Sequence, residues 1–183
     1  MNESIFLKIN SWAGQNIWLD RFMIFSADWP GYFFIGILIL YLIHDRVTDT
    51  VLEKRNKNTE MFFISLAAAV IARFIFVELI RFFYYNPRPF LVLQNVYQLL
   101  DYEAKSSFPS GHAAFYFALA AGVYLYNRKL GWIYFFGAVL MGFARVFSGI
   151  HWPVDIIAGA ILGIITTKLL SNYLYRIYES FFF

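Results

Sequence analysis

The residues best able to do chemistry lie in two segments that are far apart along the chain. The first segment carries Arg81 and Arg88 with six residues between them, followed by the run Pro109-Ser110-Gly111-His112. The second segment carries Arg145, His151 and Asp155, with five and then three intervening residues. Taken singly, each has an ordinary explanation, because an arginine near a span end reaches the lipid headgroups and a serine before a helix caps it.

Together, the two segments predict a site for a phosphate group. The guanidinium groups of Arg81, Arg88 and Arg145 match phosphate oxygens and neutralise their charge. Ser110 and Gly111 open an apolar run that reads as a helix, and the free backbone N–H groups at a helix start attract anions. Gly111 has no side chain, so the backbone can come close to a ligand there.

His151 and Asp155 supply the reactive groups of this site. They are four residues apart, so they share one face of a helix that begins near Pro153. A carboxylate at Asp155 holds one imidazole nitrogen of His151 and leaves the other free to attack phosphorus. His112, from the other segment, is then the general acid that protonates the departing oxygen. This set predicts a reaction without a metal or any other cofactor.

The elements that position these residues are predicted to be membrane-spanning helices. The chain is 60% hydrophobic and 15% charged, whereas a soluble domain has about 45–50% apolar and about 25% charged residues. A span needs roughly 20 apolar residues, with about 17–25 tolerated. Five runs come close to that length: Trp29–Ile43, Met61–Tyr85, His112–Tyr126, Leu130–Ser148 and Pro153–Tyr173. We therefore expect an all-α integral membrane protein with five clear transmembrane helices in a single domain over residues 1–183.

The first 27 residues leave two interpretations open. Apolar residues recur at helical spacing beside polar ones, Gly14 interrupts the pattern, and Asp20 and Arg21 follow. We expect an amphipathic helix in the membrane interface, and a sixth, weakly hydrophobic span is the alternative. Either one completes a core of six helices.

Positive charge predicts which side of the membrane each connection faces. Basic residues cluster in Arg46–Lys57 and at Arg128-Lys129, two connections separated by two spans, and the positive-inside rule places both in the cytoplasm. The connections Asn86–Gly111 and Gly149–Trp152 then face outward. The chemistry-bearing residues would lie together at the outer face of the cell membrane. The chain has no cysteine, which excludes disulfides and thiolate metal sites.

The order of these motifs resembles the three-part signature of the type-2 phosphatidic acid phosphatase superfamily, in which Lys-x6-Arg-Pro precedes Pro-Ser-Gly-His and Ser-Arg-x5-His-x3-Asp. The resemblance implies that Arg88, Ser110, Gly111 and Arg145 hold the phosphoryl group and that His151 forms a phosphohistidine. It also implies a six-helix core with the site near the outer leaflet. The chain departs from the pattern at Arg81, where lysine is usual, and at Ala144, where serine is usual. We expect retuned activity from these two changes, because the first keeps the charge and the second removes one hydroxyl contact to phosphate.

The resemblance is greatest to the undecaprenyl-diphosphate phosphatases, which implies hydrolysis of undecaprenyl diphosphate in the recycling of the cell-wall lipid carrier. Phosphatidylglycerophosphate and phosphatidic acid are alternative substrates, since phosphatases for both share the motifs. The expected partners are the lipid phosphate and membrane lipids and not nucleic acid, and the oligomeric state stays open. The stretch Leu91–Lys105 is expected to form a lid or an interfacial helix. Aromatic residues near the site either line a groove for the lipid tail or form an interfacial belt: Phe82, Phe83, Tyr84, Tyr85, Phe90 and Trp152.

A transporter and a catalytically degenerate lipid-binding protein are the rival classes. A transporter is expected to carry ionisable residues through its spans and a broken helix at the midplane. Here Arg73 and Glu78 are the only charges deep in a span outside the motifs, and we expect them to pair with each other or with Arg81. The intact set of His112, His151 and Asp155 argues against a degenerate protein.

Overall fold

The computed structural model describes the backbone of residues 2–28, 30–48, 52–103 and 105–182, and their side chains except at 30, 45–48, 52–56 and 176–182. Every regular element within these residues is helical. In chain order the elements are α1 (Asn2–Asn10), α2 (Ile17–Asp28), α3 (Pro30–Thr48), α4 (Leu52–Ile71), the π-helical turn η1 (Ala72–Phe76), α5 (Val77–Phe83), α6 (Pro89–Val92), α7 (Gly111–Tyr126), α8 (Arg128–Phe147) and α9 (Pro153–Phe182). The prediction of an all-α protein is confirmed.

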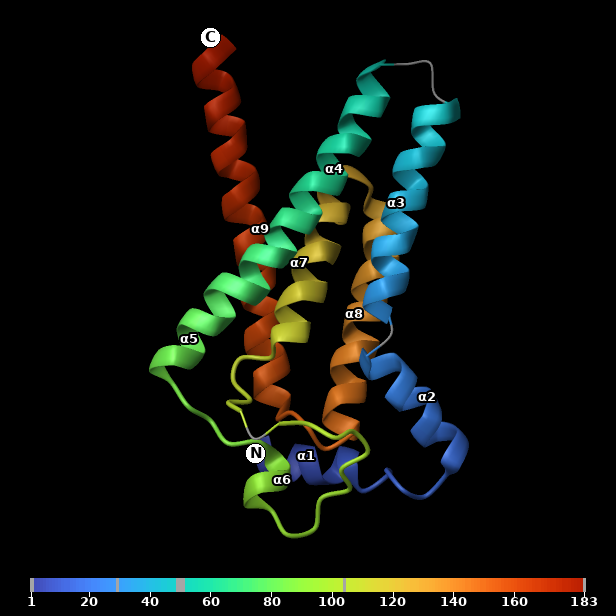
Figure 1. Ribbon diagram of the computed structural model, residues 1–183, viewed down its shortest axis with the longest axis vertical. Coiled ribbons are helices and arrows are strands. Elements are labelled where there is room, and N and C mark those ends of the chain that lie inside the picture. The colour runs from blue at the N-terminus through green and yellow to red at the C-terminus, as the bar shows by residue number, and fades with distance from the viewer. Residues whose placement is uncertain (1, 29, 49–51, 104, 183) are drawn as a thin grey trace.

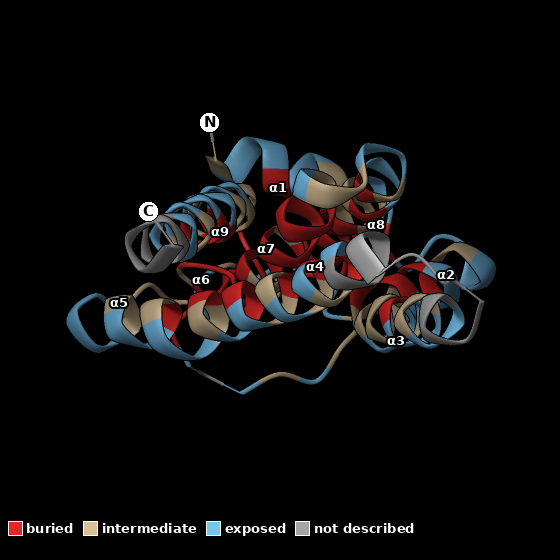
Figure 2. Ribbon diagram, turned by 90° about the horizontal axis from the view of Figure 1, so that it is seen from above, coloured by how far each residue is buried: buried red, intermediate tan, exposed pale blue. Residues whose placement is uncertain are grey.

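Helix α7 lies at the centre of the bundle, with α4, α8 and α9 packed around it (Figures 1 and 2). Small residues allow this close packing, as is usual between membrane helices. A Cβ on Gly163 of α9 would meet the backbone of α7 at Ala114 and Ala118, and one on Gly122 of α7 would meet Ser65 of α4. Both glycines therefore let helix backbones approach closely, and they fix α7 along its length.

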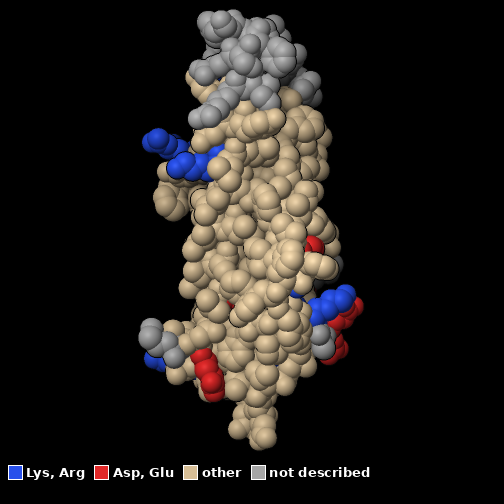
Figure 3. Space-filling model, turned by 90° about the vertical axis from the view of Figure 1, so that its left-hand side faces the viewer, with Lys and Arg blue, Asp and Glu red and all other residues tan. Residues whose placement is uncertain are grey.

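The outer surface of the bundle is apolar, as a lipid-facing surface must be. Phe63, Phe136 and Leu169 are each at least 60% exposed. Figure 3 shows a broad band with few charged side chains between an upper and a lower level where charges gather. Three stretches are long and apolar enough to span a membrane: Lys57–Phe83, Arg128–Phe147 and Pro153–Tyr175, with mean hydropathies of 2.3, 1.6 and 1.7. These stretches match three of the predicted spans.

The remaining two predicted spans are α3 and α7. Helix α3 meets the span criteria only together with α2, as the bent pair Ile17–Asp28 and Gly31–His44 with an angle of 54° between them. Helix α7 has 16 residues and is shielded from lipid by its neighbours, since most of its residues are buried. A helix of that length is about 24 Å long, slightly less than the hydrocarbon core.

Residues 2–28 form two helices, α1 and α2, and neither meets the span criteria by itself. Helix α1 has nine residues, about 13 Å, and lies across the lower end of the bundle in Figure 1 against α8 and α9. The position of α1 supports the expected interfacial helix, whereas α2 counts toward a span only as the bent pair with α3, so the interfacial position of this segment stays a prediction. Helix α2 packs along α8 and leads into α3. The basic cluster Arg46–Lys57 lies almost entirely outside the residues whose side chains are described.

The connection from α5 to α7 crosses the same lower end (Figure 1). The only helix among the described residues of this connection is the four-residue α6, so the expected interfacial helix over Leu91–Lys105 does not continue beyond Val92 in the part that the structure describes. The side chain of Asn10 holds this connection: it donates to the carbonyls of Tyr97 and Phe147 at 2.8 Å and accepts from the Tyr97 N–H at 2.9 Å. The connection is thereby fixed beneath the ends of α7, α8 and α9, where the two motif segments meet.

Candidate active site

His151 and Asp155 come together where α9 begins. Pro153 is the first residue of α9, which places Asp155 in the first turn and His151 just before it. Asp155 Oδ2 lies 3.2 Å from His151 Nδ1 and accepts the Trp152 N–H at 2.9 Å. Asn86 Nδ2 donates to Asp155 Oδ1 at 3.4 Å. With the carboxylate on Nδ1, that nitrogen carries the proton and Nε2 keeps a free lone pair.

The His151 ring is held neutral by its surroundings. The side chain is 1% exposed. Burial, reinforced by the positive charges of Arg145 and Arg88, lowers the pKa of His151 well below its ordinary value of about 6.5. At neutral pH the imidazole is therefore unprotonated, which is the form that a nucleophile needs.

Two buried arginines lie beside this ring. Arg88 Nη1 donates to the Ile150 carbonyl at 2.7 Å and lies 3.4 Å from His151 Nε2. Arg145, on α8, donates through Nη1 to the Ala27 carbonyl and to Asp28 Oδ1, both at 3.1 Å. Burial lowers the pKa of Arg88 to about 10, so it stays charged at neutral pH.

The arginines present hydrogen-bond donors that no protein group accepts. Among the described residues, Arg81 Nε, Arg88 Nε and both Nε and Nη2 of Arg145 are buried without a partner. An unpaired buried donor costs about 1–3 kcal/mol, and more when it is charged. A phosphoryl group would accept from several of these donors at once, so the three arginines fit an anion and not an apolar ligand.

Ser110 joins the two motif segments. Its backbone N–H donates to the Asp155 carbonyl at 3.0 Å. Its hydroxyl caps α7 by accepting the Ala113 N–H at 3.4 Å. The predicted cap is thus confirmed, and the cap brings the start of α7 against the start of α9.

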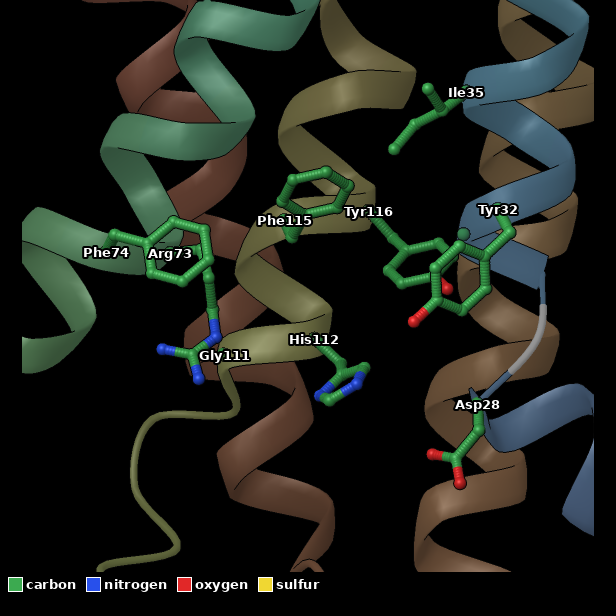
Figure 4. A pocket seen from close by; sticks show the side chains of 10 residues that line it. Asp28, Tyr32, Ile35, Arg73, Phe74, Gly111, His112, Phe115 and Tyr116 are labelled. Carbon is green, nitrogen blue, oxygen red and sulfur yellow. The ribbon is translucent and has the colours of Figure 1, made fainter.

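Gly111 and His112 lie at the edge of a cavity of about 380 Å³ between α2, α3, η1 and α7 (Figure 4). His112 stacks on Tyr116, with ring centroids 6.4 Å apart, and its ring faces into the cavity. The absent side chain of Gly111 leaves room for a protein group, because a Cβ there would meet the guanidinium of Arg73. In the structure, the group that approaches the Gly111 backbone is therefore the Arg73 side chain, where a ligand was expected.

The structure places all eight predicted site residues in the connection from α5 to α7 or at the ends of α5, α7, α8 and α9 beside it. Arg81 donates through Nη2 to the Pro109 carbonyl at 3.0 Å and through Nη1 to Glu78 at 3.3 Å. Arg73 pairs with Glu78 at 2.5 Å, which confirms the expected pairing of the two deep charges.

Several residues of the site were missed in the sequence. The Tyr102 ring lies 4.4 Å from the guanidinium carbon of Arg88 and 5.0 Å from that of Arg145, so it braces both groups by cation–π contacts. Asn86 supports Asp155, and Asp28 pairs with Arg145. Asn86 could have been found from the sequence, because it stands two residues before the motif residue Arg88. Tyr102 could not have been found in this way, because it lies outside the motifs.

The aromatic residues near the site separate into two groups. Phe82, Phe83, Tyr84 and Tyr85 are between 53% and 82% exposed, as expected of an interfacial belt. Trp152 is buried against Phe6, with ring centroids 5.2 Å apart, and donates through Nε1 to the Pro87 carbonyl at 2.9 Å. Trp152 therefore fixes the loop that carries His151.

Ala144, the second departure from the motif pattern, faces an apolar cluster. It is fully buried with Ala13, Met23, Ala27 and Phe147. Its methyl group packs α8 against the N-terminal residues. A contact from this position to phosphate is thus not suggested by its surroundings.

The chain is similar in sequence or in structure to several known proteins. The family model described as the PAP2 superfamily matches residues 62–179. A protein of Bacillus licheniformis named bacitracin transport permease protein BcrC is 30% identical over 91% of this chain and 77% of its own length. The undecaprenyl-diphosphatase BcrC of Bacillus subtilis is 29% identical over 90% of this chain and 80% of its own. The crystal structure of Aquifex aeolicus LpxE superposes with a TM-score of 0.70 at 28% identity, covering 94% of this chain and 95% of that one.

Proposed function

Since the chain belongs to the PAP2 superfamily and is a membrane phosphatase, we propose that it hydrolyses undecaprenyl diphosphate to undecaprenyl phosphate and phosphate. The substrate is supported by the similarity, over about nine tenths of the chain, to a relative named undecaprenyl-diphosphatase. The chemistry is supported by the 3.2 Å contact between His151 and Asp155 beside arginine donors that have no protein acceptor. We further propose that residues 1–183 act as a single domain.

The reaction begins with His151 as nucleophile. Its Nε2 attacks the terminal phosphorus while Asp155 accepts the hydrogen bond from Nδ1–H and stabilises the imidazolium that forms. The N–P bond forms as the bond to the bridging oxygen breaks, and the electron pair leaves with that oxygen. His112 gives it a proton. Arg81, Arg88 and Arg145 hold the phosphoryl oxygens, with Ser110 and Gly111 at the start of α7.

The second step releases phosphate. Water attacks the phosphohistidine, His112 takes up its proton, and the N–P bond breaks to regenerate His151. Positive charge from the arginines replaces a metal ion in both steps, so the proposed mechanism is metal-independent. A chelator such as EDTA should leave turnover unchanged, and strong inhibition would exclude this mechanism.

A side-by-side assay tests the substrate. Phosphate release is measured in detergent micelles from undecaprenyl diphosphate, phosphatidylglycerophosphate and phosphatidic acid, with His151→Ala as the blank. We expect kcat/KM to be at least roughly tenfold higher for the diphosphate, a difference of about 1.4 kcal/mol. An equal or higher value for either phospholipid would assign the chain to that lipid.

The active site is proposed to face the outside of the cell. Arg128 and Lys129 stand at the opposite end of α7 from His112, and the positive-inside rule keeps such residues in the cytoplasm. The chain has no cysteine, so single cysteines can report sidedness. A membrane-impermeant maleimide on intact cells should label Glu103→Cys and spare Lys129→Cys. The reverse pattern would place the site in the cytoplasm.

Transport is the second candidate, because one relative is named a bacitracin transport permease. The described charges gather at the ends of the bundle. Of the two deeper charges, Glu78 pairs with Arg73 and also contacts Arg81. This arrangement favours chemistry at one face over a path through the bundle. Purified protein that releases phosphate in micelles, with no membrane to cross, would decide for the enzyme.

A further inference from the structure

Arg73 is a cation within the site that the phosphatase mechanism above does not use. It lies on η1, a π-helical turn in the middle of the longest apolar span. Such turns are frequent at functional sites, and a charged side chain within a membrane span is costly and often marks a binding site. Both features make Arg73 a candidate for binding something that carries negative charge.

The position of Arg73 relative to His112 indicates which negatively charged group Arg73 would bind. Both residues line the cavity in Figure 4, with the Arg73 guanidinium beside the start of α7 and the His112 ring on the same helix turn. The lining residues are Asp28, Gly31, Tyr32, Ile35, Arg73, Phe74, Gly111, His112, Phe115 and Tyr116. His151, Arg88 and Arg145 are not among them. The cavity therefore meets the site at the acid and not at the nucleophile.

The mechanism assigns a chemical group to that side. His112 protonates the oxygen that leaves the terminal phosphorus, so whatever is bonded to this oxygen lies on the same side as His112. In a lipid diphosphate that group is the second phosphate, followed by the lipid chain. The rest of the cavity wall suits the chain, since Ile35, Phe74 and Phe115 are apolar.

We propose that Arg73 binds the phosphate of the leaving group, and so makes the enzyme selective for lipid diphosphates over lipid monophosphates. The proposal rests on the function proposed above. As the bond between the terminal phosphorus and the bridging oxygen breaks, negative charge grows on the leaving phosphate. The positive charge of Arg73 stabilises it while His112 supplies the proton. A lipid monophosphate places its lipid chain there and has no second phosphate, so Arg73 adds little to its hydrolysis.

The contacts of Arg73 hold it ready for this role. Nη1 is paired with Glu78 at 2.5 Å, and Glu78 also contacts Arg81 at 3.3 Å, which ties Arg73 to the arginines of the phosphate site. The side chain is 25% exposed. Gly111 leaves the space in which the guanidinium lies, because a Cβ there would meet its Nε, Cδ and Cζ atoms. Asp28, the acidic residue among the described residues of the cavity wall, is itself paired with Arg145.

The test compares two substrates that differ only in the second phosphate. Phosphate release from farnesyl diphosphate and from farnesyl phosphate is measured for the wild type and for Arg73→Gln. For Arg73→Gln we expect kcat/KM for the diphosphate to fall by roughly 30-fold or more, and that for the monophosphate to change by less than about threefold. Arg73→Lys should restore part of the loss on the diphosphate alone. Arg128→Gln, the same substitution at the far end of the bundle, should change neither value.

The ratio of the two kcat/KM values decides the proposal. An equal fall on both substrates would show that Arg73 only supports the fold, and no fall on either would show that it does not bind the leaving group. If Arg73→Gln does not fold, the same ratio is read from Arg73→Lys. A wild type that prefers the monophosphate would overturn the proposed substrate, while the change of the ratio in the variants would still test Arg73.

Discussion

His151 lies in the loop before α9 and His112 in the first turn of α7, and the two histidines differ in burial and in the space beside them. The nucleophile side of the site (His151, Asp155, Arg88 and Arg145) is buried, and its members are bonded to one another or to backbone carbonyls. The leaving-group side (His112 and Arg73) borders an open cavity of about 380 Å³ with apolar walls. The side that would meet the phosphoryl group is thus rigid, and the side that would meet the rest of the lipid is open.

This difference has a chemical reason. Attack on phosphorus requires one geometry whatever lipid is attached, and a preorganised set of donors stabilises its transition state best. The leaving group varies in size and charge between lipids, so its binding site has to admit it from the membrane. Changes on the nucleophile side should therefore affect all substrates alike, whereas changes on the leaving-group side should depend on the leaving group.

The largest effect is expected at His151. His151→Gln removes the nucleophile and should lower kcat by at least about 10⁴-fold, as loss of a nucleophile does elsewhere. The loss should be equally severe for a lipid diphosphate and for p-nitrophenyl phosphate. Phosphate release gives the rates, and acid-labile labelling of the protein by a ³²P substrate should be present in the wild type and absent in the variant. Turnover within tenfold of the wild type would remove His151 from the mechanism.

A smaller and substrate-dependent effect is expected at His112. His112→Gln removes the acid and should slow hydrolysis of a lipid diphosphate by roughly 10²–10⁴-fold. For p-nitrophenyl phosphate the burst of nitrophenolate, which reports the first step alone, should slow by less than about tenfold, because nitrophenolate leaves without a proton. The two rates are measured on the same preparation. Equal losses on both substrates would mean that His112 does not act by protonating the leaving group.

The buried imidazole should also make the stability of the fold depend on pH. The pKa of His151 is lowered in the folded state and returns to about 6.5 on unfolding, so below pH 6.5 the unfolded chain binds a proton that the folded chain does not. Above pH 6.5 neither state binds this proton, so His151 does not lower the free energy of unfolding there. As the pH falls below that value, the free energy of unfolding should decrease by up to about 1.4 kcal/mol per pH unit.

His151→Gln is the comparison that isolates this proton. Unfolding midpoints in detergent at pH 7.5, 6.5 and 5.5 should fall more steeply for the wild type than for the variant. Parallel profiles would show that the imidazole titrates normally in the folded protein, and would contradict its tight burial on the nucleophile side.

Arg81 lies between the two sides, and a milder effect is expected there. Arg81→Lys restores the usual residue of the motif and keeps the charge, but an ammonium does not reproduce the planar fork that now contacts Pro109 and Glu78. We expect kcat/KM to change by less than roughly tenfold, about 1.4 kcal/mol. A complete loss of activity would show that the planar group has become essential in this chain.

The sequence predicted the parts of the structure that follow from local spacing. The i and i+4 positions of His151 and Asp155, the cap at Ser110 and the apolar runs each depend on a short stretch. The first two are found as expected, and three of the five predicted runs meet the criteria for a membrane span. Tyr102 and Asn10 could not be predicted, because their roles depend on which distant loops meet at the end of the bundle. The fit of Arg73 against Gly111 likewise depends on how η1 packs on α7, and the spacing of residues along one helix does not predict that packing.

Ala144 shows how a motif position and its surroundings can disagree, and the smallest effect is expected there. The motif suggests that Ala144→Ser would regain a contact to phosphate, but in this chain the residue is fully buried in an apolar cluster with Ala27 and Phe147. A serine hydroxyl in such a place bonds to the carbonyl four residues earlier in its own helix. We therefore expect kcat/KM to change by less than about threefold on a diphosphate and on a monophosphate alike, which is less than 1 kcal/mol by the usual conversion. A clear gain on both substrates would mean that the hydroxyl reaches the phosphoryl group, and that α8 lies closer to the nucleophile side than the packing of Ala144 indicates.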